Sequence, residues 1–375
     1  MKNKRTKLKQ QILFEIAKKF DIKGQILSIK PYGNGLVNKT FLVETQTNKY
    51  ILQQISKNMG DEQKLMTNIK NITDYIESKK MTTMKLVPTA DGQSFERVGN
   101  QNFRLFEFFE GKVYETINSF EDFKKAAIAF AKFSKALEHF PANDLYITLP
   151  EFHNTQKRYE DFLEAVRCGN QARVKLAKEQ IDFLIVNNFL IDEINTLIAL
   201  GLPKRIIHGD TKINNIIFGK RHTCVIDFDT VMPSYLCYDF GDAIRSGCNN
   251  AKENQPETDV TFNILNYAAF AKGYLAVWDD ISPVEQKSLL VAPLLVTYEL
   301  CLRFLTDFLQ DDKYFNTTYK NENLDRCKNQ IALLCKMKQK YPLMKKIFFA
   351  CMHNKPLFEN KTLTQSQTPP QQNKE

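Results

Sequence analysis

The sequence lacks the features that mark membrane, secreted and metal-stapled proteins. Its eight cysteines form no C-x-x-C pair and several lie within apolar patterns, which argues for buried thiols in a reducing cytosol over a disulfide or zinc framework. Glu15, Lys18 and Lys19 interrupt the apolar stretch that a signal peptide needs after a basic start. We also expect no run of transmembrane length. These absences predict a cytoplasmic protein without a membrane partner.

A dense basic patch with interleaved aromatic residues is missing as well. The net charge is +9, but the lysines are spread along the whole chain, so nucleic acid is not an expected partner. With 375 residues, 43% of them hydrophobic, the chain has enough apolar material for a large core and more than one lobe. The sequence does not indicate an oligomeric state.

The first hundred residues are dominated by short strand patterns. A helical pattern over residues 6–20 is followed by a strand in GQILSIKPYG and by a hairpin in KTFLVETQTNKYILQQI. A charged helix is predicted over about 61–79, and short strands follow it. Strands around one helix suggest a small five-stranded lobe that ends near Phe106.

Helical spacing prevails from about Ser119 onward. Helices are predicted over residues 120–140, 156–169, 171–200 and several segments after Pro256. The exception is RIIHGDTKINNIIFGKRHTCVIDFDTV, a polar β-hairpin with strands at 205–208, 215–218 and 224–227. The tail, residues 359–375, has little to bury and is expected to be disordered.

The polar groups of this hairpin are suited to metal-dependent phosphoryl transfer. Its fold-back places Asp210, Asn215 and Asp227 at one end. One carboxylate can orient a hydroxyl while the amide and the second carboxylate hold magnesium on phosphates. Each residue alone is consistent with a local turn cap, but their joint spacing favours a kinase. Asp229 points to the same side in an extended segment, where it would touch a metal or substrate, or else cap a turn.

The segment H208-G-D210-x-x-x-x-N215, followed by V-I-D227, resembles the catalytic loop and metal-binding Asp of the aminoglycoside phosphotransferase and choline kinase family. This family has the protein-kinase fold. The next residues, DFDTVMPSYLCYDFGDAIR, resemble bacterial N-acetylhexosamine 1-kinases more narrowly. The resemblance extends from YGNGLVNKTF to RFLTDFLQDDKYF.

The resemblance implies an α+β, bilobal, protein-kinase-like fold. Residues 1–106 would form a small β-rich nucleotide-binding lobe with one main helix, and residues 107–113 a hinge. Residues 114–358 would form a larger, mostly helical lobe for catalysis and acceptor binding. Asp210 would be the base, and Asn215 and Asp227 would bind Mg²⁺.

Structural roles are implied for two further residues, His208 and Asp239, which would hold the catalytic loop.

The nucleotide side of the predicted site begins with PYGNGLVNKTFLV, where backbone amides can approach phosphates. An Asn-Gly pair is also common in hairpin turns, but the segment occupies the place of the kinase phosphate loop. The predicted ATP contacts are Gly33, Asn34, Gly35, Asn38, Thr40, Gln53, Glu107, Phe108 and Phe109. Gln53 stands where kinases usually carry a phosphate-binding Lys, so more phosphate charge would fall on Mg²⁺ and loop amides.

The acceptor side is expected near TYELCLRFLTDFL, which carries Glu299, Arg303 and Asp307 at four-residue steps. Such a ladder is commonly a set of solvated ion pairs. By resemblance to N-acetylhexosamine 1-kinases, Arg303 and Tyr314 are predicted to contact a sugar, together with Asp229.

The predicted function is therefore ATP- and Mg²⁺-dependent transfer of a phosphoryl group to the anomeric hydroxyl of an N-acetylhexosamine. One alternative keeps the chemistry and changes the acceptor to choline, homoserine or an aminoglycoside. Another is a pseudokinase binding module, suggested by Gln53 in place of Lys. A protein kinase is disfavoured because H-R-D and A-P-E elements are missing.

Overall fold

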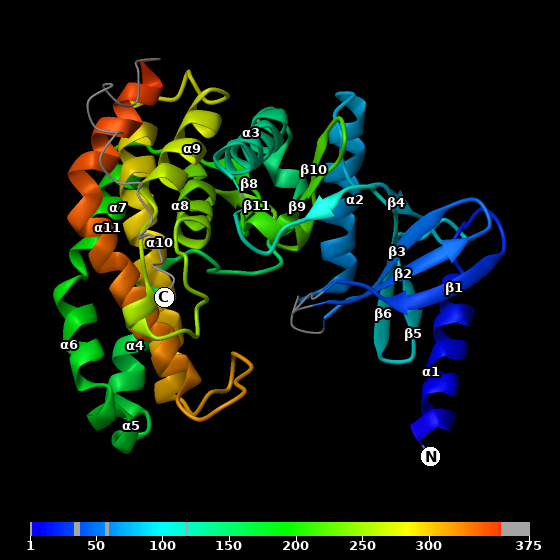
Figure 1. Ribbon diagram of the computed structural model, residues 1–375, viewed down its shortest axis with the longest axis horizontal. Helices are drawn as coiled ribbons and strands as arrows, with labels where there is room; N and C mark the ends of the chain where they lie inside the picture. Colours follow the sequence, from blue (N-terminus) through cyan, green and yellow to red (C-terminus); the bar gives the residue numbers. More distant parts are fainter. Residues whose placement is uncertain (1, 34–37, 57–59, 118, 354–375) are drawn as a thin grey trace, which may run out of the picture.

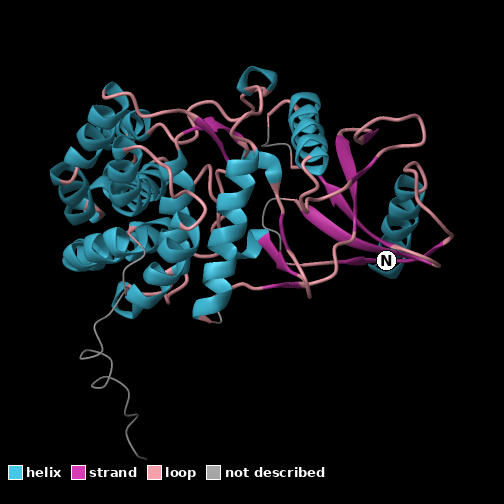
Figure 2. Cartoon of the chain, turned by 90° about the horizontal axis from the view of Figure 1, so that it is seen from above, coloured by secondary structure: helices cyan, strands magenta, loops and turns pink. Residues whose placement is uncertain are grey.

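The computed structural model describes residues 2–33, 38–56, 60–117 and 119–353. The tail predicted to be disordered, residues 359–375, lies outside these ranges. A β-sheet with two helices makes up one part of the molecule, and a larger helical part lies beside it (Figures 1 and 2). This is the α+β class predicted from the sequence.

The sheet has six strands in the described residues, with the order β1-β2-β3-β6-β4 and β5 paired to β6. Its elements are α1 (Lys2–Ala17), β1 (Ile26–Pro31), β2 (Lys39–Thr45), β3 (Lys49–Gln54), α2 (Glu62–Ser78), β4 (Leu86–Val87), β5 (Glu96–Val98) and β6 (Gln101–Glu107). Five strands were expected from the sequence. The difference arises because the short strands β4 and β5 both pair with β6.

The two faces of the sheet have different neighbours. Side chains alternate between the two faces along a strand. On one face, Leu52 and Leu105 pack in a small apolar cluster that includes Phe20, a residue that follows α1 in the chain. The opposite face of β6 carries Arg104 and Phe106. Phe106 belongs to the large apolar cluster that also contains the buried face of α2 and the helical part.

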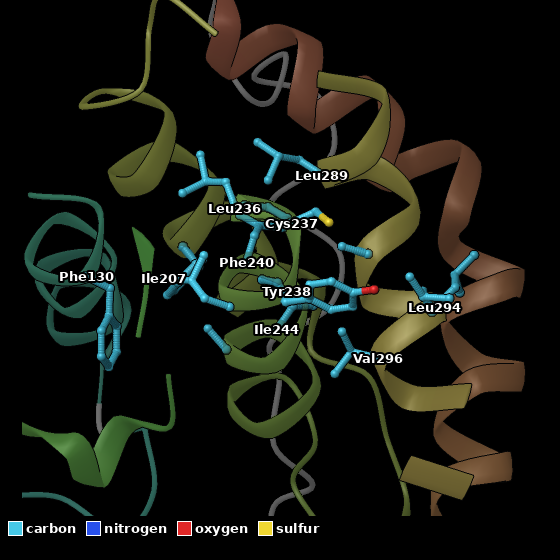
Figure 3. Packing of buried hydrophobic residues seen from close by; sticks show 14 of the residues in the cluster. Phe130, Ile207, Leu236, Cys237, Tyr238, Phe240, Ile244, Leu289, Leu294 and Val296 are labelled. Atoms are coloured by element: carbon cyan, nitrogen blue, oxygen red, sulfur yellow. The ribbon is translucent and has the colours of Figure 1, made fainter. Parts of the chain in front are cut away.

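The helical part is built around two antiparallel-packed long helices and a shorter buried one. Its helices are α3 (Phe120–Ala136), α4 (Thr155–Cys168), α5 (Gln171–Leu176), α6 (Lys178–Val186), α7 (Phe189–Ala199), α8 (Leu236–Gly247), α9 (Ile264–Leu275), α10 (Pro283–Leu309) and α11 (Glu322–Met352). Figure 3 shows Phe240 of α8 in this core, and its ring packs against Phe270 and Tyr274 of α9. Gly241 permits the close approach of α8 to α10, because a Cβ there would lie 2.6 Å from the Ala292 carbonyl oxygen.

One of these helices corrects the expectation that no segment reaches transmembrane length. By length and hydropathy α10 is sufficient to cross a membrane, but 78% of its most apolar stretch is buried inside the protein. A capping box of Ser282 and Glu285 starts the helix. The apolar character of α10 is therefore explained by its place in the core. All eight cysteines are free, and five of them are buried.

The helix predicted over residues 171–200 is divided into α5, α6 and α7. The first break is at Ala177, whose backbone leaves helical geometry at φ −99° and ψ 18°. The second is at Asn187, whose side-chain amide donates to the Phe183 carbonyl. The ammonium of Lys338 binds the Asn187 side-chain oxygen. These side-chain contacts compete with continued helix.

The polar β-hairpin predicted over residues 205–227 is only half correct. Strands β9 (Ile216–Phe218) and β10 (Thr223–Val225) do form a hairpin, and β7 (Lys112–Val113) joins them. The strand before them, β8 (Arg205–Ile207), pairs instead with β11 (Met232–Ser234). Pro233 is tolerated in β11 because a two-stranded sheet leaves one side of each strand unpaired.

Candidate active site

The loop between β8 and β9 is held by the side chain of Asp239 on α8. Its two carboxylate oxygens accept hydrogen bonds from the backbone N–H groups of His208 and Gly209, both at 2.8 Å. The fully buried His208 ring lies 3.0 Å from the Ile226 carbonyl through Nε2. These contacts give Asp239 and His208 the structural roles expected from the sequence.

Gly209 brings this loop against the turn that follows Asp227. It adopts φ +82°, and a Cβ there would lie 2.6 Å from the Thr230 carbonyl oxygen. The Thr230 hydroxyl donates to the His208 carbonyl at 2.8 Å. Only glycine allows both the backbone conformation and this contact, so the two functional loops are packed as one unit.

Asp210 sits in this unit with two donors on its side chain. Lys212 Nζ lies 2.9 Å from Oδ1, and Asn215 Nδ2 donates to Oδ2 at 3.1 Å and to the Asp210 carbonyl at 2.8 Å. Burial acts to raise the pKa of Asp210, but the charge and hydrogen bond of Lys212 outweigh it and lower the pKa below its usual value. Asp210 is therefore ionised at neutral pH and can accept a hydrogen bond from a hydroxyl.

Asn215 and Asp227 present oxygen atoms that fit a hard divalent cation. The Asn215 side-chain N–H groups are used on Asp210, and no described residue donates to its Oδ1. The Asp227 carboxylate likewise has no hydrogen bond or ion pair with a described residue. Burial, then the nearby charge of Asp229, raises the pKa of Asp227 to about 7. A carboxylate without a bonded partner, close to two other carboxylates, is suited to a bound cation.

Within the described ranges, no three His, Cys, Asp or Glu side chains are arranged to hold a metal ion by themselves. Mg²⁺ commonly takes one or two protein ligands and fills its other positions with phosphate oxygens and water. The Asn215 and Asp227 pair matches that pattern.

Asp229 has a different environment from the one expected. The residues after Asp227 form a 3₁₀ turn, Phe228–Thr230, rather than an extended segment, and Asp227 itself adopts φ +67°. The Asp229 carboxylate is turned to Arg104, with Nη1 2.5 Å from Oδ1, and it also accepts from Asn38 at 2.8 Å. The extended segment expected here is therefore wrong, whereas a contact of Asp229 with metal or substrate stays a prediction.

The loops face a cleft of about 1620 Å³ between the sheet and the helical part. Ten of the residues predicted to form the site line it: Gly33, Asn38, Thr40, Gln53, Glu107, Phe108, Phe109, Asp210, Asn215 and Asp227. Asn34 and Gly35 lie outside the described residues. The sequence thus brings both halves of the predicted site to one cleft, while their roles in binding stay predictions.

The segment Glu107 to Phe109 has fewer free backbone N–H groups than expected for binding a nucleotide base. The N–H of Glu107 donates to the Lys85 carbonyl at 2.8 Å, and the N–H of Phe108 to the Lys49 carbonyl at 3.1 Å. The Phe108 ring meets Tyr32 edge to face. Of these three amides, only that of Phe109 has no partner among the described residues.

Arg303 and Tyr314 are not among the residues that line the cleft. The Arg303 guanidinium lies 5.6 Å from the Phe152 ring centre and 5.5 Å from that of Phe315, and Nη2 lies 3.5 Å from the Tyr314 hydroxyl. The structure therefore does not bring this pair to Asp210, and an acceptor contact by either residue stays a prediction.

The flanking carboxylates of the same helix are not solvated, contrary to the expectation for a surface ladder. Glu299 is buried and accepts from the Thr155 hydroxyl at 2.6 Å. Asp307 is buried and accepts from the backbone N–H groups of Tyr314 and Phe315. Both carboxylates fix neighbouring segments to α10.

Two cations of the site were missed in the sequence. Lys212 stands two residues after Asp210, where its proximity to the base was a readable signal. Arg104 is buried on β6 directly opposite Gln53. It offered no local signal, because its partner is 125 residues away along the chain.

Comparison with known proteins identifies the class of this fold. A spectinomycin phosphotransferase solved with ADP and spectinomycin has a TM-score of 0.58 at 14% identity, covering 91% of this chain and 98% of that chain. Choline kinase from Cryptosporidium parvum has a TM-score of 0.56 at 15% identity, covering 90% and 99%. The fold is that of the protein-kinase-like phosphotransferases.

The chain belongs to the phosphotransferase enzyme family, which it matches over residues 28–278. A curated relative, homoserine kinase from Zymomonas mobilis, is 23% identical over 233 residues, 62% of this chain and 68% of that enzyme. The predicted family is thus confirmed, and phosphoryl transfer to a small-molecule hydroxyl is its class of activity. The narrower likeness to N-acetylhexosamine 1-kinases stays a prediction.

Proposed function

We propose that this protein is an ATP-dependent sugar kinase that phosphorylates the anomeric hydroxyl of an N-acetylhexosamine in the cytoplasm. The phosphoryl-transfer part of the proposal is supported by Asp210, Asn215 and Asp227 in one cleft. The anomeric position and the N-acetylhexosamine are supported by the sequence after Asp227. The choice of a neutral polyhydroxyl acceptor is supported by the wall of the cleft.

Asp210 would orient the acceptor hydroxyl toward the transferred phosphoryl group. Its lowered pKa makes it a weak base, so its main contribution is a charge-assisted hydrogen bond that aligns the nucleophile. An anomeric hydroxyl is more acidic than an ordinary alcohol, which eases the late transfer of its proton to Asp210. Lys212 holds one carboxylate oxygen while the other is aligned by Asn215.

Asn215 Oδ1 and the Asp227 carboxylate would hold Mg²⁺, which supplies positive charge to the phosphate oxygens. The nucleotide base would lie toward the Phe109 amide. Gly33 lines the cleft, where its backbone would approach the phosphates. Gln53 carries no charge, so it leaves the phosphates to the metal and the backbone.

The cleft wall formed by the end of α8, the segment that follows it, and α11 carries the argument for a neutral acceptor. Its arginines are already paired: Arg245 lies 2.8 Å from both Asp242 and Glu253, and Arg326 lies 2.8 Å from Glu322. Among the described charged side chains of this wall, Lys252 has no ion pair, whereas Glu253 and Glu322 are both paired. The wall therefore offers a cationic group of an acceptor no unpaired carboxylate.

The same wall is rich in amides, which bind hydroxyl groups. The amide side chains that line it are Asn249, Asn250, Asn254, Asn266 and Gln330. The Gln330 Oε1 atom is buried without a hydrogen-bond partner among the described residues.

A second candidate is homoserine, because curated relatives at 21–24% identity are homoserine kinases. Homoserine carries an ammonium and a carboxylate, and each would need an unpaired partner. Lys252 is available to the carboxylate, but the described carboxylates of this wall, Glu253 and Glu322, are paired and leave no partner for the ammonium.

The test is ADP release in the presence of Mg²⁺ with GlcNAc, GalNAc, glucose, homoserine, choline and kanamycin as separate acceptors. We expect the highest kcat/KM with an N-acetylhexosamine, and ³¹P NMR should place the phosphate on C1. Turnover of homoserine with no turnover of any sugar would select the second candidate.

A further inference from the structure

A buried ion pair joins the sheet to the metal-binding turn. Arg104 of β6 binds Asp229 through two contacts, Nη1 to Oδ1 at 2.5 Å and Nη2 to Oδ2 at 3.1 Å. The side chains are only 2% and 5% exposed. Asp229 stands two residues after the proposed metal ligand Asp227, so this contact reaches the metal site from the opposite part of the molecule.

Further polar side chains of the sheet form hydrogen bonds to Arg104 and Asp229. Gln53 of β3 accepts from Arg104 Nε at 2.9 Å and donates to the Thr40 hydroxyl of β2 at 3.2 Å. Asn38, just before β2, donates to Asp229 Oδ2 at 2.8 Å and accepts from the Ser56 backbone at 2.9 Å. Asp229 is thereby fixed to segments at β2, β3 and β6.

Stability alone does not account for a charged pair at this position. Replacement of a buried ion pair by apolar side chains of similar size is often neutral or stabilising, because two charges no longer need to be desolvated. Asp227 also adopts a left-handed conformation, φ +67°, which is costly for a residue with a Cβ. A turn of this kind needs support from its surroundings, and the Arg104 contact supplies it on the sheet side.

We propose that Arg104 is a positioning residue for the metal ligand Asp227: by binding Asp229 with two donors, it holds the turn over residues 227–229 at the geometry that Mg²⁺·ATP requires. The inference rests on the proposed use of Mg²⁺ and ATP, but not on the identity of the acceptor. Gln53 supports this contact by accepting a hydrogen bond from Arg104. The position that usually carries a phosphate-binding Lys thus aligns the ion pair here.

The decisive variant replaces both charges by apolar groups, Arg104→Met with Asp229→Leu. Calorimetry would measure ATP affinity with EDTA and with saturating Mg²⁺, and a thermal melt would report folding. We expect a folded protein with a lowered Tm, because Gln53 and Asn38 each lose a hydrogen-bond partner, and unchanged ATP affinity in EDTA. The gain in ATP affinity on adding Mg²⁺ should fall at least about 10-fold, because the metal ligand is no longer held in place.

The matched control removes another long-range ion pair, Arg173 with Asp312, whose groups lie 2.6 Å apart and do not line the cleft. Arg173→Met with Asp312→Asn should keep the full Mg²⁺-dependent gain. A full gain in the Arg104 and Asp229 double variant would overturn the proposal.

If the double variant does not fold, Arg104→Lys decides. Lysine keeps the charge but offers no planar pair of donors, so it should fold and lose a several-fold part of the Mg²⁺ gain. A Lys variant with the wild-type gain would reject the positioning role. Wild-type protein that binds Mg²⁺·ATP but phosphorylates no sugar would refute the proposed acceptor and leave this inference standing. Wild-type protein with no Mg²⁺-dependent gain would refute both.

Discussion

Lys212 Nζ lies 2.9 Å from Asp210 Oδ1, so the proposed base and a cation form an ion pair inside the catalytic loop. The pair lowers the pKa of Asp210 despite burial. The two carboxylates therefore differ: Asp210 has a positive neighbour in contact, whereas Asp227 has no ion pair with a described residue.

Removal of this cation should move the pH profile of the reaction. Asp210 must be ionised to accept the hydroxyl proton, and Lys212→Met removes the charge that lowers its pKa. The pKa of Asp210 then rises, and the acidic limb of the kcat profile should shift to higher pH. The profile of Lys220→Met, an exposed residue outside the cleft, should stay as in wild type. A Lys212→Met profile that coincides with wild type would separate the ion pair from the chemistry.

Asp210→Asn should lower kcat by about 10²- to 10⁴-fold, the usual effect of losing a positioned general base. ATP affinity measured by calorimetry should hardly change, since the proposed contact of Asp210 is with the acceptor. Asp192→Asn, an exposed substitution of the same chemistry, provides the control. Near wild-type turnover by Asp210→Asn would exclude a role for this carboxylate in the reaction.

Asp227→Ala should abolish turnover and remove most of the Mg²⁺-dependent gain in ATP affinity, because metal bridging neutralises phosphate charge that Gln53 cannot. Affinity for ATP in EDTA should stay nearly constant. Calorimetry with and without Mg²⁺ separates the two effects. Equal Mg²⁺·ATP affinity in mutant and wild type would contradict the assignment of Asp227 as a metal ligand.

Glu299→Gln should destabilise the protein in a pH-dependent way. Burial acts to raise the pKa of Glu299, but the hydrogen bonds of His153 and Thr155 lower it below its usual value of 4.5. A carboxyl group whose pKa is lowered by folding stabilises the folded state. This contribution is complete at pH values above the unfolded-state pKa, and it is lost as the pH falls through the folded-state pKa.

The expected cost of this substitution is about 1–3 kcal/mol at pH 7, and it should shrink below about pH 4. Urea unfolding at both pH values measures the difference. Glu179→Gln, on the exposed side of α6, should cost well under 1 kcal/mol at either pH. A Glu299→Gln deficit that is equally large in acid would mean that ionisation of Glu299 is not its cause.

The sequence predicted the parts of the site that depend on local spacing. Asp210 and Asn215 lie on one short loop, so their separation is nearly set by the chain, and β9 with β10 brings Asp227 back to them. The pairing of β8 with β11 was not predictable in the same way, because Pro233 hides the second strand and the contact is nonlocal. The orientation of Asp229 depends on the backbone of Asp227 and on a buried arginine from the sheet. Neither property leaves a periodic pattern.

The two apolar clusters that meet at β6 divide the molecule unequally. Leu105 belongs to the small cluster with α1, whereas its neighbour Phe106 belongs to the large one with α2 and the helices. Detachment of α1 would expose part of the small cluster and leave the contacts of the large cluster in place, so local opening is expected first at this outer edge. Amide hydrogen exchange should therefore be faster in β1 and the described part of α1 than in α2.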